Sequence, residues 1–109
     1  MTQHHRESES DFDEDGLLED PSAWNRALAE RIAQAEGIGI LTEAHWRIIH
    51  ALREYHAKYR AAPPIPQICR DLGMPKHAAH DLFHTCMTAW RIAGLPNPGE
   101  EAKAYLSDM

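Results

Sequence analysis

The stretch Trp90-Arg91-Ile92-Ala93-Gly94-Leu95-Pro96-Asn97-Pro98 ends the longest apolar-periodic run of the chain. Gly94 follows the last periodic residue, at the place where a left-handed glycine commonly closes a helix. Pro96 and Pro98 cannot continue a helix, because proline lacks the backbone N–H and its ring clashes with the preceding turn. The stretch therefore predicts a helix that stops at Gly94 and a stiff, extended arm that leaves the domain.

Start and stop signals predict a first and a second helix upstream. Asp20-Pro21 begins the first, as an N-cap acid followed by proline at the first helical position, and Gly37 ends it. Thr42 caps the second helix, which ends before Pro63-Pro64. The expected inner positions are Trp24, Leu28, Ile32 and Ala35 in the first helix, and Trp46, Ile49, Leu52, Tyr55, His56 and Tyr59 in the second.

Helical periodicity also predicts a short third helix and a longer fourth one. The third closes at Gly73, and the fourth opens at Lys76 or His77 and runs as one helix through Trp90. A last turn or two of helix is expected after Glu100. We therefore predict an all-α fold, a small orthogonal helical bundle, with these inner positions in its third and fourth helices: Ile65, Ile68, Cys69, Leu72, Ala79, Leu82, Phe83, Cys86, Met87 and Trp90.

The 109-residue chain has a net charge of −6, and its acidity is concentrated at the N-terminus. Residues 1–20 carry −7, from eight acids and Arg6, whereas the remaining residues carry +1, from nine acids and ten bases. The polar first ten residues predict a disordered tail. No apolar run approaches the roughly 20 residues of a membrane span and no signal segment opens the chain, so we expect a cytoplasmic protein that does not enter membranes.

Several short motifs mark the chain: Asp13-Glu14-Asp15-Gly16-Leu17-Leu18, Trp24, Gly37-Ile38, Leu41-Thr42-Glu43-Ala44-His45-Trp46, Leu52-Arg53-Glu54-Tyr55 and Ile92-Ala93-Gly94-Leu95-Pro96-Asn97-Pro98. In this order they resemble the DsrC/TusE family of small sulfur-relay proteins, named for the gamma subunit of dissimilatory sulfite reductase. The resemblance implies a short β-hairpin within residues 12–18, and partners among sulfurtransferase assemblies and siroheme sulfite reductase. It divides the chain into a tail (1–10), a DsrC/TusE-like helical domain (11–98) and a C-terminal arm (99–109).

The chain departs from the family at the cysteines. Family members that carry sulfur do so on a cysteine at the tip of the C-terminal arm, and some have a second cysteine directly before Ile-Ala-Gly-Leu-Pro. Here Trp90 stands at the upstream position and no cysteine follows Pro98, which excludes persulfide carriage on the arm. Cys69 and Cys86 fall on apolar helix faces, where a reduced thiol behaves as a small, inert hydrophobic group.

The third and fourth helices also fit a helix-turn-helix, with its turn at Gly73-Met74-Pro75. Residues 43–91 hold seven bases against four acids, a charge of +3 that is low for a protein that reads DNA through phosphate contacts. The outer face of the fourth helix is therefore a candidate surface for either DNA or a partner protein. It would present Lys76, His77, His80, His84, Thr88 and Arg91.

His77, His80 and His84 follow one another at helical spacing, which is the arrangement that could chelate a transition metal. No cysteine or carboxylate completes a ligand set on that face except Asp81, which is expected to point partly away, so a solvated face is the simpler interpretation. The sequence has no nucleophile elbow, phosphate loop or paired-carboxylate motif. We predict no metal site, no cofactor and no catalytic residue.

These observations favour a DsrC/TusE-like sulfur-metabolism protein without carrier cysteines, acting as a non-catalytic regulatory or adaptor protein that binds sulfite reductase or sulfurtransferase partners. The predicted partner-binding arm consists of Gly94, Leu95, Pro96 and Pro98. Two alternatives stay open. One is a DNA-binding transcriptional regulator that uses the helix-turn-helix, and the other is a sulfurtransferase that uses Cys86.

Overall fold

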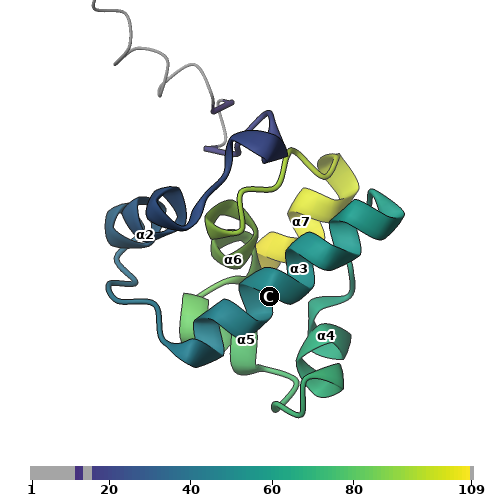
Figure 1. Cartoon of the computed structure of the whole chain (residues 1–109). Coiled ribbons are helices and arrows are strands. Elements are labelled where there is room, and N and C mark those ends of the chain that lie inside the picture. Colours follow the sequence, from purple (N-terminus) through teal and green to yellow (C-terminus); the bar gives the residue numbers. More distant parts are fainter. Residues whose placement is uncertain (1–11, 14–15, 109) are drawn as a thin grey trace, which may run out of the picture.

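The computed structural model of the chain describes residues 12, 13 and 16–108, and the tail expected over residues 1–10 lies outside them. The described part is helical and contains no β-strand, which confirms the predicted all-α class (Figure 1). None of its helices is both long and apolar enough to cross a bilayer. In chain order, the elements are the 3-10 helix η1 (Pro21–Ala23) and the α-helices α2 (Arg26–Ala35), α3 (Glu43–Tyr59), α4 (Ile65–Asp71), α5 (Ala78–Phe83), α6 (Cys86–Ile92) and α7 (Glu100–Asp108).

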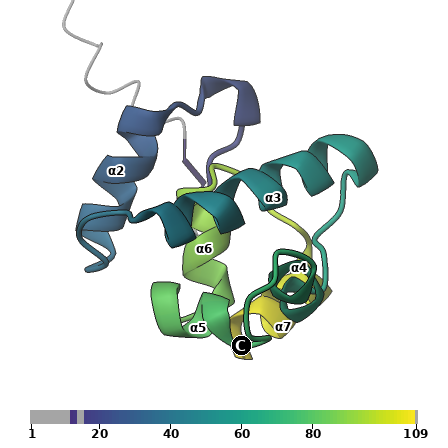
Figure 2. The same ribbon diagram turned by 60° about the horizontal axis from the view of Figure 1, so that its bottom comes forward.

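The short helix α6 lies at the centre of the fold. It packs against α2, α3, α5 and α7, and six of its seven residues are buried. A helix that is covered on most of its surface must be largely apolar, and Arg91 is accordingly the one charged residue of α6. Helix α3 crosses α6 and also packs on α4 and α5 (Figure 2).

The start of α3 is fixed by a buried histidine. The backbone N–H of Thr42, the N-cap residue, donates to Nδ1 of His45 at 3.0 Å. Because Nδ1 accepts this bond, Nε2 carries the proton and donates to the carbonyl oxygen of Leu82 at 3.0 Å. His45 thus links the first turn of α3 to α5. The sequence predicts Thr42 as the cap, but it does not predict His45 as an inner residue.

The predicted first helix is divided into two. Asp20 caps η1, accepting a hydrogen bond from the backbone N–H of Ser22 at 3.0 Å. The chain then becomes extended at Trp24 and Asn25, and the Asn25 side chain caps α2 by accepting from the N–H of Leu28 at 2.8 Å. A second capping residue within the run therefore starts a new helix. One consequence is that the core-facing alanines of α2 are Ala29 and Ala33, whereas Ala35 is exposed.

The predicted fourth helix is also divided, at His84. This residue has a φ of 74°, which a right-handed helix cannot accommodate. Thr85 follows in an extended conformation and caps α6, with its hydroxyl oxygen accepting from the N–H of Thr88 at 3.1 Å. The prediction of one helix from Lys76 to Trp90 is therefore wrong, because apolar periodicity alone does not reveal a change of direction.

The segment from Phe12 to Leu18 forms a tight loop closed by one antiparallel bridge between these two residues. Asp13 holds the loop at both ends: its N–H donates to the carbonyl of Leu17 at 2.8 Å, and its carboxylate accepts from the N–H of Leu17 at 3.0 Å. Leu17 and Leu18 are buried in the domain. The hairpin implied by the family resemblance is thus reduced to a single bridge within the described residues.

Candidate functional site

The base of the C-terminal arm is a helix end with two specific backbone hydrogen bonds. Gly94 adopts a φ of 70°, as predicted for a left-handed cap. Its N–H donates to the carbonyl of Arg91 at 3.0 Å, and the N–H of Leu95 donates to the carbonyl of Trp90 at 3.4 Å. This pair of bonds is the Schellman motif, in which a hydrophobic residue after the glycine packs back on the last turn. Leu95 is accordingly only 1% exposed.

Trp24 covers this helix end. The indole N–H donates to the carbonyl of Ile92 at 2.9 Å. The indole also lies so close to Gly94 that a β-carbon on this residue would stand 2.1 Å from Cδ1 of Trp24. Position 94 therefore requires glycine for two independent reasons, its backbone conformation and the approach of the ring.

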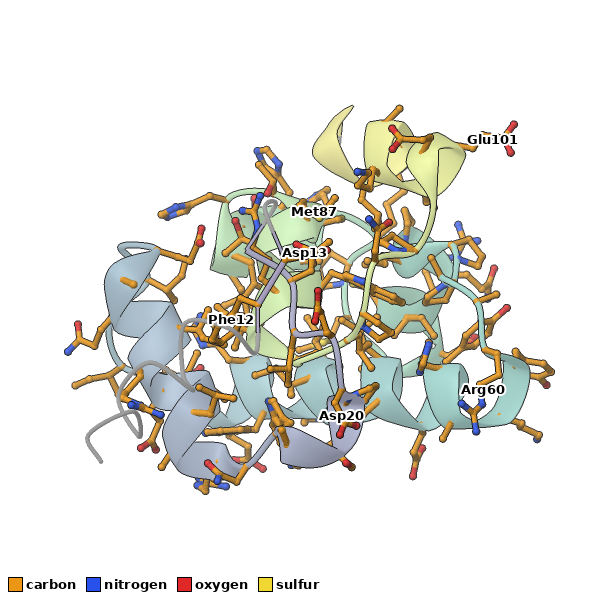
Figure 3. All side chains as sticks on the ribbon, turned by 90° about the horizontal axis from the view of Figure 1, so that it is seen from above. Phe12, Asp13, Asp20, Arg60, Met87 and Glu101 are labelled. Carbon is orange, nitrogen blue, oxygen red and sulfur yellow. The ribbon has the colours of Figure 1, made fainter. Side chains whose placement is uncertain are left out.

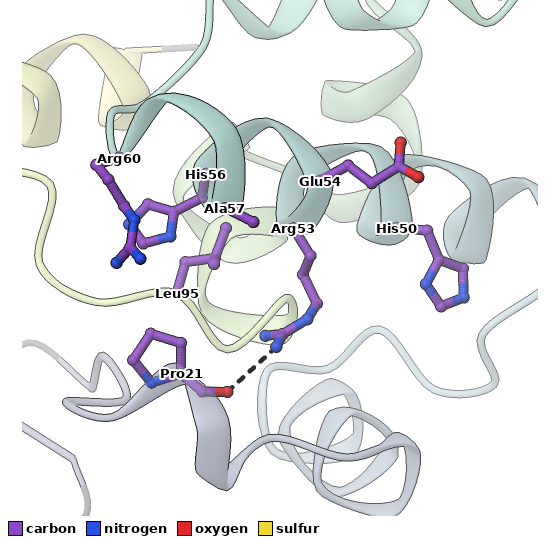
Figure 4. A pocket seen from close by; sticks show the side chains of 8 residues that line it. All are labelled: Pro21, His50, Arg53, Glu54, His56, Ala57, Arg60 and Leu95. Atoms are coloured by element: carbon purple, nitrogen blue, oxygen red, sulfur yellow. Dashed lines mark hydrogen bonds between the residues drawn. The ribbon is translucent and has the colours of Figure 1, made fainter.

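Arg53 holds the same helix end to α3. Its guanidinium donates to the carbonyl of Ala93 at 2.7 Å and to the carbonyl of Pro21 at 3.1 Å, the second bond being drawn in Figure 4. The guanidinium carbon lies 4.1 Å from the centroid of a Trp24 ring, in cation–π contact. Burial lowers the pKa of Arg53, and these contacts compensate the charge for its lost hydration. We call the cluster of Trp24, Arg53 and Gly94 the arm clamp.

Trp90 fixes the next residues of the arm. Its side chain is completely buried, which confirms that it faces the core. The indole N–H donates to the carbonyl of Pro96 at 2.8 Å, and the ring packs nearly perpendicular to that of His56, with 6.0 Å between the centroids. Trp90 thus anchors the arm to the domain.

The rest of the arm returns to the body. Asn97 turns the chain by accepting from the N–H of Gly99 through its side-chain oxygen at 2.8 Å. Helix α7 then packs on α6, and Leu106 is completely buried. Glu101 points from α7 into solvent (Figure 3). The segment over residues 95–108 therefore differs from the predicted extended arm, because apolar residues on it reach the core.

A hollow of about 520 Å³, here called the arm pocket, opens between η1, α3 and Leu95. Burial lowers the pKa of His56 in its wall, and the charges of Arg60 and Arg53 lower it further, so this imidazole is neutral at pH 7. The positive charge of the pocket therefore comes from its arginines. Figure 4 shows its lining: Pro21, His50, Arg53, Glu54, His56, Ala57, Arg60 and Leu95.

The two cysteines lie inside the domain. Cys69 is 0% exposed and Cys86 is 3% exposed. Burial raises the pKa of Cys86 to about 11, with a smaller contribution from Cys69, and burial also raises the pKa of Cys69. Both groups are therefore neutral thiols at pH 7, whereas the thiolate is the nucleophile in sulfur chemistry.

The residues of the predicted DNA or partner face are only partly brought together. Lys76, His77 and His80 line one hollow. His84 is exposed at the break between α5 and α6. Arg91 instead lies beside α2, where its guanidinium donates to the Glu36 carboxylate at 3.4 Å. The helix-turn-helix and the role of this face stay predictions.

The histidines have other contacts than a shared metal. Nδ1 of His77 lies 2.9 Å from a carboxylate oxygen of Asp81, at the (i, i+4) spacing of helical pairs. Asp81 therefore points toward His77 and not partly away. No three His, Cys, Asp or Glu side chains gather as a metal-binding group within the described part of the chain.

Arg53 and Trp24 are the site residues whose roles sequence reasoning missed. Both belong to motifs that carried the family resemblance, but helical periodicity gave no reason for an arginine inside α3. One signal was available. Arg53 stands seven residues after Trp46 and three before His56, so it shares their helix face.

The fold and this site define a class: small helical domains in which a short central helix ends in a glycine cap and a C-terminal segment folds back. The family model described as "DsrC like protein" matches residues 4–100. The chain therefore belongs to the DsrC/TusE family. It is 34% identical, over 101 residues, to a Sulfurtransferase TusE homolog of Haemophilus influenzae, covering 84% of this chain and 92% of that protein.

Solved structures agree. The oxidized gamma subunit of the dissimilatory sulfite reductase (DsrC) from Archaeoglobus fulgidus superposes with a TM-score of 0.70 at 35% identity, over 82% of this chain and 89% of that one. The DsrC/gamma subunit of Pyrobaculum aerophilum gives a TM-score of 0.68 at 33% identity, over 82% and 83% of the two chains.

Proposed function

We propose that this chain is a sulfur-relay protein of the non-carrier kind: a regulatory or adaptor protein that binds a sulfurtransferase or sulfite reductase assembly without carrying sulfur itself. Relatives named as sulfurtransferases and as the gamma subunit of sulfite reductase support the pathway. The proposal that the chain does not carry sulfur is supported by its own cysteines, which are buried.

The observation that carries the proposal is the state of the thiols. A sulfur carrier needs a thiolate on an exposed segment that a partner can reach. Cys86 is 3% exposed and its pKa is raised to about 11, so it meets neither requirement. Neither Trp90 nor the rest of the arm supplies another thiol that could carry sulfur. Sulfur transfer through Cys86 is the alternative, and it would require α6 to open.

The partner surface is proposed to lie along the arm and the arm pocket. Gly94 and Leu95 are buried, so their part is to hold the segment in place. Pro96 and Pro98 are half-buried and can contact a partner directly. Arg60, exposed at the end of α3 and in the pocket wall (Figure 3), supplies a positive charge that an acidic partner group would meet.

The carrier question is tested with a persulfidated donor protein and intact-mass measurement. We expect no sulfur adduct, because the donor's outer sulfur has no thiolate to attack it. A stoichiometric gain of one sulfur atom that Cys86→Ser abolishes would overturn the non-carrier proposal in favour of the sulfurtransferase.

The adaptor role is tested by recovering sulfite reductase or sulfurtransferase subunits from the native host. Arg60→Glu should lower the recovery at least tenfold with only a small drop in melting temperature, which comes from placing a negative charge at the C-terminal end of α3. Arg31→Glu, an equal charge reversal on exposed α2, is the control and should bind as the original chain does. If the original chain, Arg60→Glu and Arg31→Glu all recover the same amount of partner subunits, the interaction surface does not include Arg60.

A further inference from the structure

The arm pocket holds two guanidinium groups whose charges the fold leaves without a counter-ion. Arg53 donates to the carbonyl oxygens of Ala93 and Pro21, which replace lost water but carry no net negative charge. Among the described residues, neither Arg53 nor Arg60 has an ion-pair partner. Two like charges that face one hollow repel one another, and an anion between them relieves this repulsion. The pocket is therefore suited to a negatively charged group.

His56 lies within the field of both arginines. Burial lowers the pKa of His56, and Arg60 and Arg53 lower it further, so the imidazole is neutral at pH 7 although its neighbours are charged. Neither ring nitrogen has a hydrogen-bond partner among the described residues, and neither is sealed from solvent. The ring of His56 is therefore free to bond to a group that enters the pocket.

The other titratable side chains of the pocket lining are His50 and Glu54, both on α3. Figure 4 shows the Glu54 carboxylate pointing away from Arg60 and His56, so it does not neutralise the arginines. Helix η1, the arm and α6 face His56 with uncharged side chains: Pro21, Leu95 and Trp90. The protonation of His56 is thus governed by the two arginines and by an anion that binds beside them.

The backbone of Arg60 is strained. It has a φ of 54° at the C-terminal end of α3, in the left-handed region where glycine commonly closes a helix. An arginine there costs free energy that a glycine would not, and such strain at a non-glycine residue points to a function of its side chain. The helix stop alone therefore does not explain this arginine.

We propose that Arg60 and His56 bind a carboxylate of an acidic segment of the partner protein, and that His56 takes up a proton from solvent as the carboxylate binds. Since the arm pocket is the proposed partner surface, this site rests on the proposed function. The carboxylate accepts from the guanidinium fork and from an imidazolium N–H, and its negative charge offsets the arginines that keep His56 neutral. Proton and carboxylate must therefore strengthen each other's binding.

The test is an NMR titration of the full chain with an acetylated tri-glutamate amide, observed at the ring protons of His56. Binding should saturate and should raise the pKa of His56. The affinity should increase at least about threefold from about pH 8 to about pH 6, an interval in which the peptide stays ionised. His56→Gln should lose most of this pH dependence.

Arg60→Gly separates binding from stability. It should bind the peptide at least tenfold more weakly, because the guanidinium is gone. It should not lower the melting temperature, since glycine relieves the strained backbone. Arg31→Gln, which removes an equal exposed charge on α2, is the control and should bind as the original chain does.

Two further probes identify the source of the carboxylate. The tri-glutamine amide should not bind, and glutarate should bind more weakly than the tri-glutamate peptide. Equal binding of glutarate would overturn the assignment to a partner protein and leave a site for small carboxylates. The whole proposal fails if tri-glutamate does not saturate, if Arg60→Gly binds as the control does, or if the pKa of His56 does not rise at saturation.

Failure of this site can be told apart from failure of the adaptor role. If the peptide does not bind but Arg60→Glu still lowers the recovery of partner subunits, the adaptor role stands without the carboxylate site. If the peptide binds as expected but no partner subunit is recovered from the native host, the carboxylate site stands without the adaptor role.

Discussion

The indole of Trp24 occupies the space in which any side chain at position 94 would begin: a β-carbon on Gly94 would lie 2.1 Å from Cδ1 and 2.6 Å from Cγ of that ring. The two residues are separated by most of the chain, yet each limits what the other can be. The glycine of the family motif is thus explained by a tryptophan near the N-terminus as much as by helix capping.

Gly94→Ala should destabilise the domain by about 3 kcal/mol. About 1–2 kcal/mol comes from placing an L-residue in the left-handed region, and the rest comes from overpacking against Trp24. Gly73→Ala is the control, since Gly73 has a φ of 79° but a β-carbon added to it would meet nothing within 4 Å. Gly73→Ala should lose only the part of the unfolding free energy that comes from the left-handed backbone conformation. Equal losses in urea unfolding of the two variants would contradict the role of Trp24.

Arg53→Ala should destabilise the domain by about 2 kcal/mol, because the carbonyls of Ala93 and Pro21 both lose a charged donor. Arg53→Lys should recover little, since an ammonium cannot reproduce the two-pronged donation. Hydrogen exchange at the Leu95 amide is the local measurement, and it should accelerate in both variants. Arg47→Ala, which removes one exposed contact, should change stability by less than about 0.5 kcal/mol. Slow exchange at Leu95 in Arg53→Ala would show that the clamp does not depend on this residue.

The sequence predicted most of the helices because their ends are marked by local chemistry. Thr42, Gly73 and Gly94 act within one turn of their own position, so a cap can be recognised without knowing the fold. The family's motifs added the class of protein, since their order along the chain is specific even where each motif is short.

The divisions at Asn25 and His84 were missed for a different reason. In each case the apolar pattern continues across the break and hides the local capping residues, Asn25 and Thr85, that start a new helix there. The contacts of the site are even harder to predict from sequence than the helix breaks. The contact of Arg53 with Ala93 joins residues 40 apart in sequence, and the folding back of the arm depends on Leu106 reaching the core.

Burial of Cys86 predicts a specific pH dependence of stability. The folded-state pKa of about 11 lies above the ordinary value of 9.0, so between these values the folded chain binds more protons than the unfolded one. The free energy of unfolding must then fall as pH rises from about 9 to about 11. Cys86→Ala should show a smaller fall over this interval in chemical denaturation. Cys69 and Tyr105, whose pKa values are also raised by burial, are present in both chains. Because the charge of Cys86 itself raises the pKa of Tyr105, the difference between the two curves contains this coupling as well as the titration of the Cys86 thiol. Parallel curves for the two chains would contradict the burial of this thiol.

Trp90 combines two functions that substitution can separate. The ring fills the core, and its N–H holds the carbonyl of Pro96 at 2.8 Å. Trp90→Ala should therefore destabilise the domain by about 3–5 kcal/mol through the cavity it leaves. Trp90→Phe keeps much of the volume but leaves the Pro96 carbonyl without its donor.

For Trp90→Phe we expect a smaller loss, about 1–3 kcal/mol, together with faster hydrogen exchange at Asn97 and Gly99. Faster exchange there, with the core amides of α6 still protected, would separate the anchoring of the arm from the filling of the core. It would also connect the anchor to the proposed function, because the loosened arm should bind the partner assembly less tightly than the clamped one. If Trp90→Phe leaves both exchange and partner recovery unchanged, the indole N–H has no part in holding the arm, and the packing of Leu95 and Leu106 alone keeps it on the domain.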